Sequence, residues 1–247
     1  MLRKFWYAFW RLIERCFFHG QAYSLHVPYG HRIFTPWFEE DSNSDFSQVI
    51  KMVKGFGPLV VSSDRCYILF QLARKASLIP GDLAECGVYT GGTAHLLALV
   101  LERQAISTKK LHLFDTFTGM PKTSIPSRDY HSPGDFANTS VDLVKKRLQH
   151  YDSFCIYHVG LMPVTFSEVK DIKEFSFVHV DVDIFPSVLA CCEYFYPRLS
   201  RGGIMVFDDY GFYPYRYSVR SVVDNFFADK IDKPIFLPTG QALIIKT

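Results

Sequence analysis

The sequence lacks several of the patterns that assign a protein to a class at first sight. No apolar run approaches the ~18 residues that a membrane-spanning helix needs. No internal repeat or low-complexity tract occurs, and 27 Lys and Arg residues nearly balance 25 Asp and Glu residues. A net charge of +2 gives no electrostatic basis for binding nucleic acid, so we expect no nucleic-acid partner.

Cysteine is present but not in a metal-binding or redox pattern. The six cysteines include no CxxC pair and no Cys/His spacing typical of a zinc site. Most of them lie within apolar runs: Cys16, Cys66, Cys86, Cys155, Cys191 and Cys192. We therefore expect reduced thiols in the core of a cytoplasmic protein.

The first residues form a distinct pattern. At 100° per residue, the apolar side chains of residues 2–18 fall on one broad arc, and most of the charged ones fall opposite. This predicts a basic amphipathic helix that packs on the domain, packs on a second copy in a homo-oligomer, or lies on a membrane surface. Charges interrupt the apolar run, which argues against a cleavable signal peptide.

The rest of the chain alternates between strand and helix patterns. With 48% hydrophobic residues in 247, the composition is that of a globular α/β domain with extensions. Strands are predicted at 81–88, 110–117, 154–160, 175–183 and 202–210, and helices at 64–78, 91–104, 140–151, 186–199 and 218–230. A hairpin over 234–247 closes the chain. We predict a Rossmann-like, mostly parallel sheet of seven strands with a C-terminal antiparallel hairpin over 59–247, preceded by an extension over 1–58.

Two motifs at predicted strand ends fit a nucleotide-like ligand. In "ECGVYTGGTA", Gly87 and Gly91 allow a tight turn close to a ligand, although the spacing is not the dinucleotide GxGxxG pattern. In "LFDTFTGMP", Asp115 ends the next strand and could accept hydrogen bonds from both hydroxyls of a ribose, or could cap a helix. Together they fit S-adenosylmethionine, with its methionine carboxylate near Gly87.

Two aspartate pairs follow the next two predicted strands. Asp181 and Asp183 lie in "VHVDVDIFPS", and Asp208 and Asp209 lie in "GGIMVFDDYG". Carboxylates that converge at neighbouring strand ends raise one another's pKa unless a cation compensates them. Ligation by oxygen alone favours Mg²⁺, or Mn²⁺ or Ca²⁺, over zinc. Helix capping and surface solvation are the alternatives for either pair alone.

These motifs, in this order, resemble the macrocin O-methyltransferase family over residues 55 to 246. The blocks that carry the resemblance are "GDLAECGVYTGGTA", "LFDTFTGMP", "GDFANTS", "FVHVDVDIFPS", "YPRLSRGGIMVFDDYG" and "VVDNFF". The resemblance implies a class I methyltransferase fold and a metal-dependent enzyme that methylates sugar hydroxyls with S-adenosylmethionine. One block departs from the commoner "DGDLY" of the family at Val182, Ile184 and Phe185, so packing around the acceptor can differ.

The resemblance also implies roles for individual residues. The metal ligands would be Asp181, Asp208 and Asp209. The cofactor-binding residues would be Ser62, Glu85, Gly87, Val88, Tyr89, Asp115, Thr116 and Ser140. A Mg²⁺ ion on these aspartates could chelate two adjacent hydroxyls of a small-molecule or saccharide substrate and lower the pKa of one, which gives Asp181 a catalytic role. His131 is the candidate general base, with Asp129 and Asp183 as alternatives.

Other readings of the aspartate motifs stay open. "VHVDVDIF" is also similar to the nucleophile motif of haloacid-dehalogenase-type phosphatases, although those carry it near the amino terminus. A glycosyltransferase DxD metal site would leave Asp115 and the glycine turn unexplained. A non-catalytic scaffold that uses the basic helix to recruit a partner is the non-enzymatic alternative. Binding of S-adenosylmethionine separates the predicted methyltransferase from these alternatives.

Overall fold

The computed structural model describes Trp37 and residues 44–105, 108–123 and 128–247. The amphipathic helix predicted over 2–18 lies outside the described residues, so its membrane and oligomer alternatives stay predictions. Across the described ranges, every helix is too short or too polar to cross a membrane. The five cysteines of these ranges are buried free thiols, as the sequence predicts.

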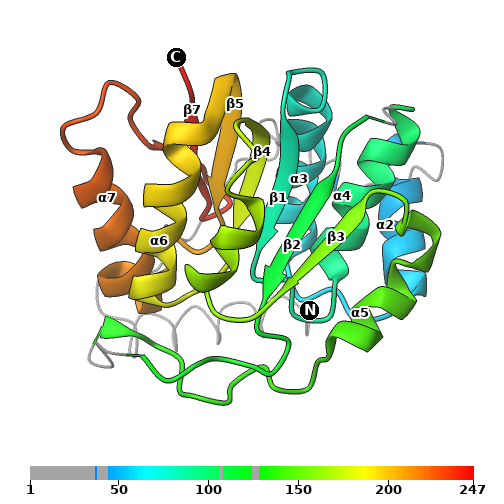
Figure 1. Ribbon diagram of the computed structural model, residues 1–247, viewed down its shortest axis with the longest axis horizontal. Coiled ribbons are helices and arrows are strands. Elements are labelled where there is room, and N and C mark those ends of the chain that lie inside the picture. The colour runs from blue at the N-terminus through cyan, green and yellow to red at the C-terminus, as the bar shows by residue number, and fades with distance from the viewer. Residues whose placement is uncertain (1–36, 38–43, 106–107, 124–127) are drawn as a thin grey trace, which may run out of the picture. The chain divides into compact units, whose positions relative to one another are not determined.

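The strands form one mixed sheet of seven, in the order β3-β2-β1-β4-β5-β7-β6 (Figure 1). β1 to β5 are parallel, and β7 is antiparallel to both β5 and β6. This confirms the predicted Rossmann-like sheet and its closing hairpin. The strands are β1 (Asp82–Cys86), β2 (Leu111–Asp115), β3 (Cys155–Val159), β4 (Phe175–Val180), β5 (Leu199–Phe207), β6 (Ile235–Phe236) and β7 (Ala242–Ile245).

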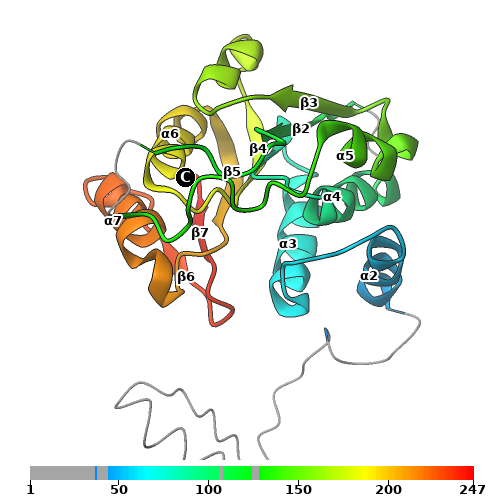
Figure 2. The same ribbon diagram turned by 90° about the horizontal axis from the view of Figure 1, so that it is seen from below.

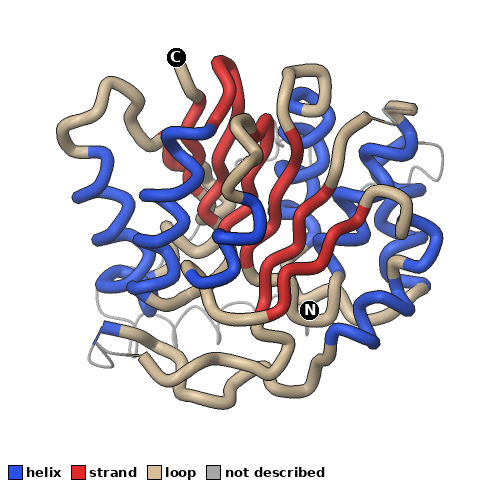
Figure 3. The backbone as a smooth tube through the Cα atoms, in the orientation of Figure 1, coloured by secondary structure: helices blue, strands red, loops and turns tan. Residues whose placement is uncertain are grey.

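Helices cover both faces of the sheet, as Figures 2 and 3 show. They are α2 (Asp45–Gly55), α3 (Ser63–Ala76), α4 (Gly92–Arg103), α5 (Val141–Arg147), α6 (Phe185–Phe195) and α7 (Ser221–Phe227). Because side chains alternate along a strand, Leu83 and Phe177 pack toward α3 and α4, whereas Val178 and Phe207 pack toward α6 and α7. Each face of the sheet therefore has its own apolar core.

Helix α2 packs on the domain although it lies in the predicted extension. The side chain of Ser44 caps its first turn, and Phe46, Val49 and Val53 are buried in the core that includes α3 and α4. The domain boundary predicted between residues 58 and 59 stays a prediction, because the packing of α2 does not show where the domain begins.

Several predicted element boundaries differ from the observed ones, and the turn between α6 and β5 is an example. The helix predicted over 186–199 ends at Phe195, and β5 begins at Leu199, before the predicted start at Gly202. Gly202 has φ +78°, and the pairing register of β4 with β5 shifts between Phe175 and Phe177. A strand that continues through a bulge at glycine is not visible as an apolar run.

Gly87 lets the ends of β1 and β4 approach each other. Its φ is +88°, and a Cβ at this position would lie 1.8 Å from the backbone oxygen of Asp181. The N–H of Asp181 donates to the carbonyl of Cys86, so the two chain segments are held at this distance. Glycine is therefore required where the cofactor turn meets the first aspartate pair.

Gly87→Ala should destabilise the fold by about 3 kcal/mol or more, because the backbone must move to admit the methyl group. Gly55→Ala is the matched control, since a Cβ at Gly55 would meet no atom within 4 Å and Gly55 ends helix α2. We expect the control to be neutral or stabilising by up to about 1 kcal/mol. Urea unfolding of both variants measures this, and equal stabilities would contradict the packing described here.

Candidate active site

A pocket lies at the carboxyl ends of the parallel strands. Figure 1 shows the described parts of the loop between β2 and α5 passing below these strand ends. The turn after β1 forms one part of its wall, and the aspartate pairs after β4 and β5 form another. In an open α/β sheet this edge is where ligands bind. The pocket thus brings together the two kinds of motif that the sequence separates by about a hundred residues.

Asp115 organises the turn after β1. Its Oδ2 accepts hydrogen bonds from the backbone N–H groups of Val88 (2.7 Å) and Tyr89 (2.9 Å). Its Oδ1 accepts from the N–H of Phe117 at 2.6 Å, and the hydroxyl of Thr116 donates to the carbonyl of Gly119. One lone pair of Oδ1 is therefore left for a ligand hydroxyl. The carboxylate holds the turn in place and still faces the pocket.

The predicted cofactor residues divide into two groups. Those that line the pocket are Gly87, Val88, Tyr89, Asp115 and Thr116. Ser62 and Ser140 are the exposed N-cap residues of α3 and α5, and the hydroxyl of Ser140 accepts a hydrogen bond from the N–H of Leu143. Glu85 is fully buried and lies behind the pocket wall. These three residues are not among those that line the pocket, and their cofactor roles stay predictions.

Three carboxylates converge at the ends of β4 and β5. One oxygen each of Asp181, Asp183 and Asp209 lies within 4.8 Å of the other two, and a second such set joins His179, Asp181 and Asp208. Asp183 reaches this position because its backbone adopts φ +58°, so the chain is no longer a regular strand there. Asp183, which the sequence suggests only as an alternative base, thus joins the cluster.

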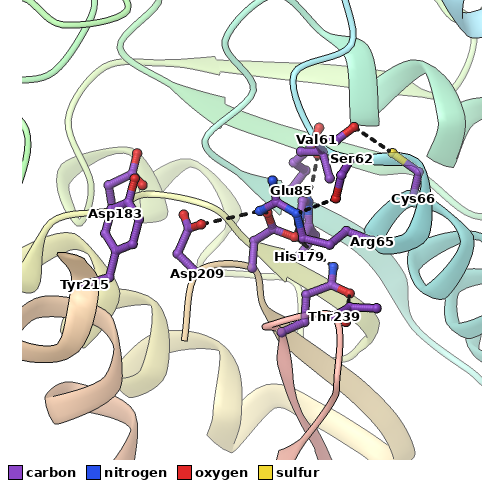
Figure 4. Close-up of polar contacts among 12 residues, drawn as sticks. Val61, Ser62, Arg65, Cys66, Glu85, His179, Asp183, Asp209, Tyr215 and Thr239 are labelled. Carbon is purple, nitrogen blue, oxygen red and sulfur yellow. Dashed lines mark hydrogen bonds and ion pairs between the residues drawn. The ribbon is translucent and has the colours of Figure 1, made fainter. Parts of the chain in front are cut away.

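Asp208 is held by side chains from two other parts of the chain. Its Oδ2 pairs with the guanidinium of Arg65 on α3, which also lies 3.4 Å from Asp209 (Figure 4). Its Oδ1 accepts a hydrogen bond of 2.7 Å from the side chain of Gln241. Each carboxylate oxygen has a second lone pair, so these bonds orient Asp208 without using up its ligand capacity.

A buried acid–imidazole pair lies under Asp208. Glu85 and His179 are register partners on β1 and β4, and Oε1 of Glu85 lies 2.9 Å from Nδ1 of His179. Nε2 of His179 lies 3.5 Å from Oδ1 of Asp208. All three residues are 0% exposed. Glu85 therefore acts on the aspartates through His179 rather than facing the pocket.

The pKa values follow from burial and from these neighbours. Burial, and then the charges of neighbouring aspartates, raises the pKa of Asp181, Asp183 and Asp209. Burial also opposes ionisation of Asp208, but His179 and Arg65 outweigh it and lower the pKa of that carboxyl. Burial disfavours the imidazolium of His179, yet the adjacent carboxylates of Asp208 and Glu85 raise its pKa to about 10. The cluster therefore holds more acid than its own cations neutralise.

His131 lies beside this cluster, in the loop between β2 and α5. Its Nδ1 is 3.2 Å from Oδ2 of Asp135, and its Nε2 is 2.9 Å from the hydroxyl of Tyr215. Nε2 also lies 3.9 Å from Asp183. Hydrogen bonds from the N–H of Ser132 and from His131 lower the pKa of Asp135. An ionised carboxylate can only accept a hydrogen bond, so Nδ1 of His131 carries the hydrogen that it donates to Asp135. The basic Nε2 is thereby directed toward Tyr215 and the pocket.

Asp129, an alternative base, has a structural partner. Its Oδ1 accepts a hydrogen bond of 2.7 Å from the N–H of Phe185, the first residue of α6. Four further residues of the site have no role assigned from the sequence: Arg65, His179, Tyr215 and Asp135, although His179 and Asp135 lie within quoted blocks. Glu85 and His179 each lie near the end of a predicted strand, so the sequence could have suggested that they face each other on neighbouring strands. Arg65 and Tyr215 come from other segments, and only the fold brings them to the site.

Solved structures share this fold. The O-methyltransferase NovP matches with a TM-score of 0.66 at 19% identity, covering 82% of this chain and 98% of that one. CalS11, a calicheamicin methyltransferase, matches with a TM-score of 0.61 at 17% identity, covering 89% and 99%. The fold is that of class I S-adenosylmethionine-dependent O-methyltransferases, as predicted.

The sequence comparison defines the family. The macrocin-O-methyltransferase (TylF) family matches residues 69–238, and the chain belongs to this family. Mycinamicin III 3''-O-methyltransferase of Micromonospora griseorubida is 26% identical over 144 residues, 53% of this chain and 56% of that protein. A tetracenomycin-C 4'-O-methyltransferase of Streptomyces olivaceus that acts on a dimethoxy-rhamnosyl derivative is 26% identical over 141 residues, 53% and 54%. The chain thus spans about half the length of these curated relatives.

His179→Gln tests the buried pair through the pH dependence of stability. The folded pKa of about 10 lies above the ordinary value of 6.5, so the stabilisation is complete below pH 6.5 and is lost as pH rises through 10. The free energy of unfolding of the wild type should fall between pH 7 and 10 by several kcal/mol more than that of the variant. Parallel curves from urea unfolding would show that His179 is not a buried cation.

Proposed function

We propose that the protein is an S-adenosylmethionine-dependent, Mg²⁺-dependent O-methyltransferase that acts on a hydroxyl of a sugar or a similar vicinal diol. The observation that carries the proposal is the one pocket that contains both the Asp115-braced turn and the carboxylate cluster. Membership of the macrocin-O-methyltransferase family supports the same reaction. The named activities of the relatives, which modify glycosylated compounds, favour a saccharide acceptor.

The turn after β1 suits the cofactor. Gly91 has φ +78° and precedes α4, so the first N–H groups of that helix are open to a carboxylate. Asp115 retains one lone pair for a ribose hydroxyl. S-adenosylmethionine would place its methionine part near Gly87 and its ribose near Asp115.

The carboxylate cluster suits a divalent cation. Four aspartates and Glu85 carry up to five negative charges, and Arg65 and His179 supply two positive charges close to them. A divalent cation would remove most of the remaining repulsion, and ligands that are all carboxylate oxygens suit Mg²⁺. We infer that Asp181, Asp208 and Asp209 hold the ion, with Asp183 beside it.

The reaction is an in-line displacement. The acceptor oxygen would lose its proton and bond to the methyl carbon, while the carbon–sulfur bond of the bound cofactor would break and leave its electron pair on sulfur. The cofactor supplies the methyl group, and the bound cation would lower the pKa of the acceptor hydroxyl. His131 accepts the proton at Nε2, because Asp135 fixes the hydrogen on Nδ1. The acceptor hydroxyl would take the place of the Tyr215 hydroxyl at Nε2.

A phosphatase or glycosyltransferase reading of the aspartates is less consistent with the pocket. Neither reaction needs the turn that Asp115 braces to line the same pocket as the aspartates. A non-catalytic scaffold would not need to keep the carboxylates together. Contacts of residues 2–18 with a membrane or with a second copy stay predictions, since these residues lie outside the described ranges.

Removal of the metal tests the proposal directly. Transfer of a labelled methyl group from S-adenosylmethionine to a panel of sugar acceptors should stop after chelation and return on addition of Mg²⁺. Asp209→Asn should lower Mn²⁺ affinity at least tenfold, measured by electron paramagnetic resonance, because a ligand charge is lost. Asp142→Asn, an acidic residue in the first turn of α5, is the control. Full activity of the chelated wild type would refute metal dependence.

His131→Gln tests the general base. We expect kcat to fall by about 10²–10⁴-fold with KM little changed, the usual contribution of a positioned base. His150→Gln, an exposed histidine in the turn after α5, should leave kcat unchanged. A wild-type kcat for His131→Gln would move the proton-accepting role to another group, and Asp183, 3.9 Å from Nε2 of His131, would be the next candidate.

A further inference from the structure

An unusual cluster of exposed tyrosines borders the pocket. The segment 210–217, directly after the second aspartate pair, reads YGFYPYRY, with five aromatic residues in eight. Tyr213 is 68% exposed and Tyr217 is 56% exposed. From the loop before α5, Tyr130 is 63% exposed. We call these three tyrosines together with Arg216 the aromatic rim.

The rim is continuous with the pocket. Tyr215, from the same segment, lines the pocket, and its ring centroid lies 5.8 Å from that of Tyr130 at an interplanar angle of 70°. Figure 4 shows Tyr215 beside Asp183, within the candidate site. None of the rim residues is among the residues that form the pocket wall. The rim therefore lies just outside the place where the reacting hydroxyl would sit.

Arg216 holds two of the rim tyrosines together. The guanidinium carbon of Arg216 lies 3.8 Å from the ring centroid of Tyr213 and 4.3 Å from that of Tyr217. The same guanidinium donates a hydrogen bond of 2.8 Å to the carbonyl of Tyr213. Rigid tyrosines offer a large amphipathic contact area at a low cost in conformational entropy. These rings are thus arranged for binding before a ligand arrives.

The chemistry of the rim matches a sugar ring. A pyranose has apolar C–H faces that stack on aromatic rings, and hydroxyl edges that bond to phenol and guanidinium groups. The rim borders the pocket that would hold the methylated sugar, so its rings lie where an adjoining sugar unit would extend. Rings, hydroxyls and one arginine favour a saccharide.

We propose that the aromatic rim is a second sugar subsite, which binds the glycosyl unit next to the one that is methylated. This rests on the proposed function, because the pocket then holds the first unit. The acceptor would contain at least two sugar units, and single sugars would bind weakly.

The test is binding of the full chain to an array of mono-, di- and trisaccharides in the presence of S-adenosylhomocysteine. The wild type should bind particular di- or trisaccharides at least tenfold more tightly than their component monosaccharides. Replacing both outer tyrosines (Tyr213→Ala with Tyr217→Ala) should abolish most of that difference. The affinity of the Tyr213→Phe, Tyr217→Phe double variant should stay within about threefold of that of the wild type, because the rings are kept. Ile231→Ala changes an exposed apolar residue elsewhere and should bind glycans as the wild type does.

Three outcomes would overturn the subsite: no glycan bound by the wild type, equal binding of monosaccharides, or no loss in the double Ala variant with its melting temperature retained. Tyrosine-dependent binding to phosphatidylglycerol vesicles in place of glycans would assign the rim to a membrane and also overturn it. Methyl transfer is measured separately. Glycan binding without methyl transfer would support the subsite and refute the proposed function. Methyl transfer to single sugars that does not depend on the rim tyrosines would support the proposed function and refute the subsite.

Discussion

Repulsion between the carboxylates that follow β4 and β5 is the constraint on which the site depends. Parallel strands end at one edge of the sheet, so Asp181 and the Asp208–Asp209 pair must meet there. Burial strengthens the repulsion, because little water is present to screen it. The surrounding elements are arranged to limit this cost.

Two cations from different elements offset part of the repulsion. Arg65 reaches the aspartates from α3, and His179 lies beneath them on β4, itself paired with Glu85. Gln241, which immediately precedes β7, completes the contacts of Asp208. The closing antiparallel strand therefore supports the site as well as the sheet. What stays unbalanced is the negative charge around Asp181, Asp183 and Asp209, next to the turn that Asp115 braces.

The sequence predicts the fold and the composition of the site better than it predicts the contacts. Apolar runs separated by helical patterns determine the parallel sheet, and strand ends identify Gly87, Asp115 and the aspartates. The buried contact of Glu85 with His179 is not evident from its motif, because the resemblance implies a cofactor contact for this residue. Arg65, Tyr215 and Asp135 could not be assigned, since their roles depend on which segments the fold brings together. The positive φ of Asp183 is likewise a backbone property that no residue pattern in this segment signals.

Diffraction from crystals grown with MnCl₂ and S-adenosylhomocysteine tests the central claim, that one pocket holds a cation and the cofactor side by side. Data collected at the manganese absorption edge locate the ion independently of the protein atoms. We predict a single anomalous peak at roughly 2.2 Å from oxygens of Asp181 and Asp209, a typical metal–carboxylate distance, with the cofactor ribose at Asp115. The claim would be contradicted if the cofactor were bound at the turn but no manganese lay near the aspartates and Arg65 were still paired with them.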